Sequence, residues 1–461
     1  MSRLNTLAKP FLPEPLYHRF ASSSIAKRLA RGSLWSLFGS ASSRVLVLVA
    51  MILVARILGQ VSFGEFGLIQ ATLGVFGIMA GVGLGSAATR FVAQYAKLDP
   101  DRAGRVIALV TGSSVVTILV ASVLLIALSG FLAERVLEAP HLQTALIWGT
   151  FLLATSAFRG IQNGTLAGLE RFDTIAKLNI LDGVLALPAI VLLASLLGVE
   201  GALLGLALSA AVVWIAGRFL LAADLRERGI RVQYRGAWAD WRILTGYSLP
   251  SFLANSVATP ALWVAMTLLA RTEHGFAQLG LYNAANQWHG PLIFLPMILM
   301  SVSVPVLVQE WEAGERGRFR KIYIAITAFA LVVTLIAAVP LALVSPWIMA
   351  LYGPDFRDGW PILILLLAAG SLHAIAKIAS GALYGMNKAW WVLLANLIWG
   401  GTLLFGTLLL LDGFGAVGLG IAFLAAYAAL GAVTASMVLI STKAPQAVIH
   451  VPGTGGSSPP R

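Results

Sequence analysis

Four charged side chains lie deep inside long apolar stretches of this sequence, where charge is costly and is usually kept for function. They are three cations and one acid: Arg44, Arg159, Lys377 and Asp182. A surplus of cations favours an anionic ligand, and arginine can hold a phosphate group through two parallel hydrogen bonds. A cavity for cationic ligands would instead need carboxylates. These residues therefore predict a substrate with a negatively charged head group, such as a diphosphate.

Each of these charges also has a purely structural interpretation. Arg44 continues a polar stripe on one helical face, which indicates a water-filled surface, although a long arginine can also extend to the membrane surface. The stripe consists of Ser33, Ser36 and Ser40. Arg159 and Asp182 are expected at similar depth, so they can form a structural ion pair instead of binding a ligand. Lys377 shares a helical face with His373, and both interpretations stay open for it as well.

Three asparagines are candidates for binding sugar hydroxyls. Asn163 lies one helical turn after Arg159, Asn255 belongs to a one-sided polar stripe, and Asn283 begins a polar cluster at the start of another apolar stretch. The other members of that cluster are Asn286, Gln287 and His289. Amides inside a membrane can bind a sugar or can bond across helices, and the sequence does not decide between these roles.

The composition identifies the solvent around this chain. Hydrophobic residues make up 58% of the sequence, charged residues only 11%, and the mean hydropathy is +0.86. Soluble domains carry about 25% charged residues, so lipid must cover most of this surface. The formal charge of +12 does not indicate nucleic acid, because basic residues gather in the cytoplasmic loops of membrane proteins. The absence of cysteine from the sequence excludes disulfides and thiol chemistry.

The apolar stretches predict an all-α polytopic membrane protein with about twelve spans, since a crossing needs about 20 apolar residues. The predicted spans are 33–56, 65–88, 104–130, 142–166, 174–197, 200–223, 244–270, 279–308, 322–346, 359–384, 389–411 and 415–440. With a cytoplasmic N-terminus, most of the 32 lysines and arginines fall in cytoplasmic segments. The outer loops then contain only Arg56, Arg135, Arg271 and Arg357. This asymmetry predicts that both termini are cytoplasmic.

The two halves of the chain match each other at a nearly constant offset. Residues 164–171 (GTLAGLER) align with 381–388 (GALYGMNK), and Gly198 and Gly415 keep the same spacing. Two six-helix bundles that both begin in the cytoplasm form a parallel repeat about an axis along the membrane normal, with a cleft between them. The predicted parts are an N-terminal segment (1–31), the first bundle (32–225), a basic linker (226–242), the second bundle (243–440) and a cytoplasmic tail (441–461).

Several motifs resemble those of polysaccharide-export flippases. They are 54–59 (VARILG) followed by 63–66 (FGEF), 83–85 (GLG) followed by 89–91 (TRF), 163–172 (NGTLAGLERF), 248–252 (SLPSF) and 280–285 (GLYNAA). In this order, and over residues 32–440, the chain resembles the oligosaccharide flippase (Wzx-type) branch of the multidrug/oligosaccharidyl-lipid/polysaccharide exporter superfamily. The long N-terminal segment departs from the usual pattern of that branch.

The resemblance implies a V-shaped pair of bundles in the bacterial cytoplasmic membrane, which works by alternating access. Its implied substrate is an undecaprenyl-diphosphate-linked oligosaccharide that moves from the cytoplasmic to the outer leaflet. The implied partners are membrane lipids and the glycosyltransferases or polymerase of polysaccharide biosynthesis, with no nucleic acid and no cofactor. A multidrug or murein-precursor exporter of the same superfamily is the alternative, although murein-precursor flippases usually have two further helices.

A membrane-embedded glycan-processing enzyme is a weaker alternative. Such an enzyme would need a substantial loop with carboxylates or a metal site, whereas the longest predicted loop, 224–243, is short and basic. The sequence contains no phosphate-binding glycine loop and no HExxH or paired-carboxylate motif. We therefore expect a transporter and not an enzyme.

The charge asymmetry leads to a test of topology. Reporter fusions after Gly59, Glu138, Glu273 and Asp355 should all report an outer location. Cytoplasmic signals from two or more of these fusions would contradict the predicted orientation.

Overall fold

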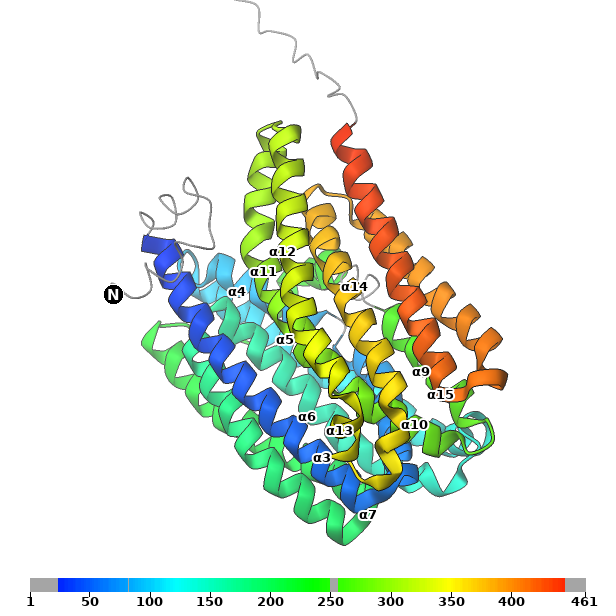
Figure 1. The fold of residues 1–461 in the computed structure, drawn as a ribbon. Coiled ribbons are helices and arrows are strands. Elements are labelled where there is room, and N and C mark those ends of the chain that lie inside the picture. The colour runs from blue at the N-terminus through cyan, green and yellow to red at the C-terminus, as the bar shows by residue number, and fades with distance from the viewer. Residues whose placement is uncertain (1–23, 82, 249–255, 444–461) are drawn as a thin grey trace, which may run out of the picture.

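The structure is a computed structural model that describes residues 24–81, 83–248 and 256–443. Within these ranges the long elements are all helices, and no strand occurs. The large apolar side chains exposed on the helix surfaces include Leu119, Leu196 and Ile336. Such a surface fits lipid and not water, so the helices form a membrane bundle (Figure 1).

Three of the helices are long enough to cross a bilayer twice. They are α3 (Ser24–Gly81), α7 (Phe172–Glu227) and α15 (Ala389–Lys443). Each is interrupted at one glycine with positive φ, namely Gly59 (76°), Gly198 (62°) and Gly415 (51°). Glycine adopts this conformation without the strain that a Cβ would cause, so the chain can turn back into a second span. In Figure 1 the two arms of α15 lie side by side.

The remaining spans are single helices, some of them broken. They are α4 (Leu84–Tyr95), α5 (Pro100–Phe131), α6 (Gln143–Gly168), α9 (Ala258–Ala270), α10 (Gly275–Asn286), α11 (His289–Glu312), α12 (Arg316–Leu343) and α14 (Trp360–Gly385), with the short α13 (Ser345–Ala350) between the last two. Eight described segments are long and apolar enough to cross a membrane, and three of these hold two spans each. They account for eleven of the twelve predicted spans, and the shorter apolar helix α9 is the described part of the remaining one, 244–270, of which residues 249–255 lie outside the described ranges.

Close helix contacts explain the glycines of the motif at 163–172. A Cβ at Gly164 of α6 would collide with the backbone carbonyl of Gly85 in α4, and a Cβ at Gly168 would lie 2.9 Å from the carbonyl oxygen of Thr89. Small residues spaced four apart allow two membrane helices to approach backbone to backbone. The motif is therefore a packing surface, and it fixes α4 against α6.

The structure repeats local features at the offset found in the sequence. Glu170 and Asn387 are both non-glycine residues with positive φ, at 60° and 59°. They lie two residues after the ends of α6 and α14, just as Gly198 and Gly415 divide α7 and α15 at equivalent positions. The same turn geometry at equivalent positions supports the repeat. The superposition of residues 32–225 on 243–440 stays a prediction.

We call α3–α7 the first half and α9–α15 the second half. Between the halves, a Cβ at Gly64 in the second arm of α3 would overlap the carbonyl oxygen of Phe276 in α10. A Cβ at Gly280 would equally overlap the carbonyl oxygen of Gln60. The two contacts are reciprocal at the repeat offset, which is the pattern that a two-fold axis produces between equivalent helices.

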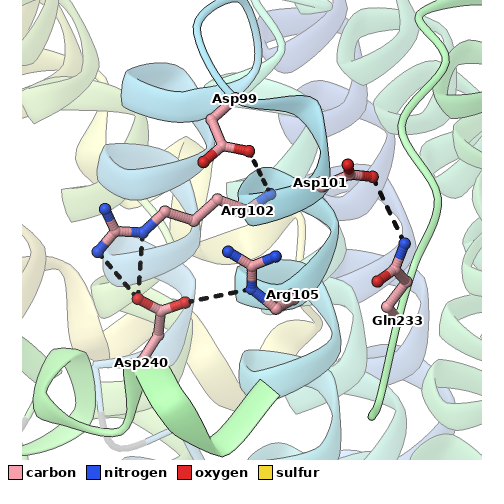
Figure 2. Close-up of polar contacts among 6 residues, drawn as sticks. All are labelled: Asp99, Asp101, Arg102, Arg105, Gln233 and Asp240. Carbon is pink, nitrogen blue, oxygen red and sulfur yellow. Dashed lines mark hydrogen bonds and ion pairs between the residues drawn. The ribbon is translucent and has the colours of Figure 1, made fainter. Parts of the chain in front are cut away.

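The basic linker packs on the first half. Asp240 accepts hydrogen bonds from Arg102 of α5 at 2.9 and 3.1 Å and pairs with Arg105 at 3.8 Å (Figure 2). Gln233 donates to Asp101 at 3.4 Å (Figure 2). Asp99 caps the beginning of α5 by accepting from the backbone N–H of Arg102. The linker is thus anchored to α5 up to Asp240.

Paired glycine substitutions test the packing of α4 on α6. Gly164→Ala should lower the free energy of unfolding by about 1–3 kcal/mol or more, because the backbone must shift to admit the methyl group. Gly160→Ala is the matched control on the same helix, since a Cβ there meets nothing within 4 Å. Thermal unfolding in detergent should leave the control unchanged or slightly stabilised. Equal behaviour of the two variants would contradict this account.

Candidate functional site

A cavity of about 420 Å³ lies between the two halves. Its first-half wall is the first arm of α3, with Ser43, Arg44, Val47 and Leu48. Its second-half wall is the junction of α10 and α11, with Asn286, Gln287, His289, Gly290 and Pro291. None of these described lining residues is acidic, so the cavity favours anions.

The junction of α10 and α11 is an irregular turn inside the predicted span 279–308, which lies within one described apolar segment, 275–312. α10 ends at Asn286 and α11 begins at His289, and the two residues between them keep right-handed helical dihedral angles. Pro291 is tolerated there because the first helical turn needs no N–H from that residue. Irregular backbone at membrane depth is stable only where protein or a water-filled cavity surrounds it. The break also directs the positive end of the α11 dipole at the cavity.

Arg44 connects the two walls of this cavity. Its Nη1 lies 3.4 Å from the carbonyl oxygen of Gly290, and its guanidinium lies 4.9 Å from the ring centroid of Phe294. The side chain of Arg44 is exposed, and it lines the cavity. A bound anion can compete for its donors, because the contact with Gly290 is long for a hydrogen bond.

Arg159 and Asp182 form the ion pair that was one of the two interpretations of the sequence. Arg159 Nη1 lies 3.0 Å from Asp182 Oδ2, and the side chains are 20% and 19% exposed. Ser209 donates to Asp182 Oδ1 at 3.1 Å, so the pair joins α6 to both arms of α7. Neither residue lines the described cavity. A role for Arg159 in ligand binding stays a prediction.

Lys377 is half-buried on the face of α14 that packs against α11. His373, one turn before Lys377 on the same face of α14, contacts His289 of α11. Gly381, one turn after Lys377, lies against Met300 and Val304 of α11. No ion pair of Lys377 with an acid is found among the described residues. Its depth on α14 resembles that of Arg159 on α6, since the two positions nearly coincide in the repeat.

The asparagine predictions have different outcomes. Asn283 is buried, and its amide lies 3.5 and 3.4 Å from the carbonyl oxygens of Phe63 and Gly64. It therefore bonds across helices, which is the structural alternative left open by the sequence. Asn163 is half-buried on α6, and Asn255 lies outside the described residues.

The sequence prediction selected the wrong member of the polar cluster as a site residue. The residues of the cluster that line the cavity are Asn286, Gln287 and His289, and not Asn283. The proline at position 291 was the available signal for a helix break in this cluster.

Two of the predicted outer-loop arginines bridge the halves. Arg56 donates to the carbonyl oxygen of Leu351, and Arg271 donates to those of Arg135 and Val136 at 2.6 and 2.9 Å. Arg271 also pairs with Glu138 at 3.3 Å. At the other end of the molecule, the start of α3 and the end of α15 lie far apart in Figure 1. The halves thus meet at the predicted outer end.

Comparison with known proteins agrees with this geometry. A family model described as "Polysaccharide biosynthesis protein" matches residues 29–311. The chain belongs to the polysaccharide biosynthesis protein family. This family member is 24% identical to the EPS I polysaccharide export inner membrane protein EpsE of Ralstonia solanacearum, over 91% of its own length and 94% of that protein.

Two further similarities extend this result. The family member is 29% identical to the lipid III flippase of Escherichia coli (strain K12), over 60% of its own length and 66% of that protein. Its fold is similar to the inward-facing conformation of a multidrug resistance MATE family transporter of the MOP superfamily, with a TM-score of 0.73 and 16% identity. That match covers 87% of this chain and 94% of the transporter. The predicted fold class is confirmed.

A double mutant separates the two roles of Arg159. Arg159→Ala leaves the carboxylate of Asp182 without its partner, so it should lower the free energy of unfolding by up to about 3 kcal/mol. This is the lower end of the cost of breaking a buried ion pair, because both side chains keep some exposure. Arg159→Ala/Asp182→Ala should recover the stability, as measured by thermal unfolding in detergent. If the double mutant also recovers full transport, the pair is structural. Recovered expression without transport assigns Arg159 to ligand binding.

Proposed function

We propose that this protein is a flippase that moves a polyprenyl-diphosphate-linked oligosaccharide from the inner to the outer leaflet of the bacterial cytoplasmic membrane. The observation that supports it most directly is the cavity between the halves, whose described lining contains Arg44 but no acid. The names of the two relatives, a polysaccharide export protein and a lipid III flippase, point to the same class of substrate. Undecaprenyl is the carrier lipid that the family resemblance implies.

The physical requirement of such a substrate explains the cavity. A diphosphate can leave water only if cations or hydrogen-bond donors replace its hydration. Arg44, the first turn of α11 and the amides of Asn286 and Gln287 supply these groups. We propose that Arg44, Arg159 and Lys377 contact the diphosphate in turn as the halves move, and that Asn163 and Asn255 contribute to sugar binding.

Alternating access is the mechanism that this arrangement supports. The contacts of Arg56 and Arg271 close the predicted outer end, and the solved transporter with a similar fold is in an inward-facing conformation. Opening toward the outer leaflet then requires these arginines to release the backbone carbonyls of the other half. Each hydrogen bond is exchanged for one to water, with a small net cost of about 1 kcal/mol. Arg271 must also separate from Glu138, an exposed ion pair that is worth little.

The proposed function also implies where the protein is located and which enzymes it works with. Both termini face the cytoplasm, the protein crosses the inner membrane many times, and its substrate comes from glycosyltransferases and passes to a polymerase. A multidrug exporter is the alternative function, and a cavity for cationic drugs would contain carboxylates. Neighbouring genes for glycosyltransferases and a polymerase would favour polysaccharide export, whereas a drug-responsive regulator would favour the alternative.

Substitution of Arg44 tests the function. Arg44→Ala should reduce export of surface glycan by about ten- to hundredfold, the worth of one or two charge-assisted hydrogen bonds. Arg44→Lys should retain more activity than Arg44→Ala because it keeps the charge. Export is measured as surface polysaccharide in a deletion strain that expresses each variant at a matched level in the membrane.

The matched control is Arg218→Ala, which removes an exposed arginine of α7. It should leave export near the parental rate. Lys377→Ala and Lys377→Arg extend the comparison to α14, where the arginine should be tolerated better. Normal insertion and parental export in Arg44→Ala would contradict the assignment of this cavity.

A further inference from the structure

Two histidines of the second half form a hydrogen-bonded pair beside the cavity. His289 Nε2 of α11 lies 3.1 Å from His373 Nδ1 of α14, and the rings stack with centroids 5.4 Å apart. Tyr427 of α15 lies against His373 at 4.3 Å between ring centroids. His289 is buried and also lines the cavity of Arg44. The pair therefore connects the cavity to the interior of the second half.

The bond between the rings limits their protonation states. One nitrogen must donate and the facing nitrogen must accept, and a ring that accepts is neutral. The pair thus holds either no net charge or one positive charge. When it takes up a proton from water, the proton binds the outer nitrogen of the donating ring, and the bond between the rings persists. A second proton would break that bond.

The surroundings determine which state is favoured. Arg44 lies across the cavity on α3, and Lys377 lies one turn beyond His373 on α14. α15 contributes the phenol of Tyr427, and the end of α10 with the turn after it contributes the neutral amides of Asn286 and Gln287. No described acid forms an ion pair with either histidine. Burial and two neighbouring cations both oppose a charge on the empty pair, and an anion in the cavity would reverse this effect.

We propose that the His289–His373 pair is a proton-binding site of the cavity, which takes up one proton when a diphosphate head group binds beside Arg44. The inference rests on the proposed anionic substrate and adds a bound proton to it. Proton and anion then favour each other's binding by the same factor, as linkage requires. The added charge offsets one negative charge of the head group while it crosses the region of low dielectric.

Calorimetry with a defined ligand tests this inference. The full-length protein in detergent is titrated with farnesyl diphosphate in buffers of different ionisation enthalpy, at a mildly alkaline pH. This pH lies above the second ionisation of a phosphate, near about 6, so the ligand itself is fully charged. We expect uptake of about one proton per bound ligand and an affinity that falls about tenfold per pH unit.

The variants His289→Gln and His373→Gln should bind the ligand with little proton uptake and a nearly flat pH dependence. Glutamine retains a polar side chain, so folding should survive. The control is His274→Asn, which changes an exposed histidine whose positive φ of 56° asparagine tolerates. It should keep the parental proton uptake.

The outcomes separate this inference from the proposed function. Ligand binding by the parental protein without proton uptake overturns the proton site, whatever the variants do. Parental uptake that persists in both glutamine variants overturns it equally, while the proposed function stands. Failure of the parental protein to bind farnesyl diphosphate overturns the diphosphate site, and the proton site with it.

Discussion

The cost of placing charge in a medium of low dielectric constrains this whole molecule. A charge at membrane depth is stabilised when it is paired or when it borders a cavity that water or a ligand can fill. Arg159 takes the first solution, since it pairs with Asp182 at 3.0 Å. Arg44 takes the second, since it borders the cavity between the halves. The two arginines look alike in sequence, but of the two only Arg44 lines the described cavity.

The same constraint acts on the backbone. Unpaired N–H and C=O groups are as costly as charges in lipid, so the interruption between α10 and α11 must lie where other polar groups satisfy it. The carbonyl of Gly290 faces Arg44 there, and the side chains around the interruption are polar. The interruption and the cation thus stabilise each other, and together they form a cavity suited to anions.

Glycine packing places these groups with little freedom. Backbone contacts between α4 and α6, and between α3 and α10, leave no room for a Cβ at Gly164, Gly64 or Gly280. The linker adds a further constraint, because Asp240 is held by Arg102 and Arg105 (Figure 2). It therefore moves with the first half. Between the halves, the polar contacts at the predicted outer end are hydrogen bonds from arginine to backbone carbonyls and the exposed ion pair of Arg271 with Glu138, which water can replace at small cost.

The sequence by itself determined the membrane class, the spans and the repeat. These features depend on local quantities, namely the length of apolar stretches and the identity of turn residues such as Gly198 and Gly415. Glu170 and Asn387 adopt matching turns, each two residues after a glycine that ends its helix. It also identified the four charges within apolar spans, because hydropathy alone makes them conspicuous.

Only the tertiary structure decided which polar groups meet. Asn283 and Asn286 are one helical turn apart, yet the first bonds to the backbone of α3 and the second lines the cavity. His289 and His373 are 84 residues apart and form a bond that no spacing rule predicts. The physical reason is that the rotation and the crossing of packed helices depend on the side chains of all their neighbours. A pattern along one helix specifies its polar face but not the partner that this face will meet.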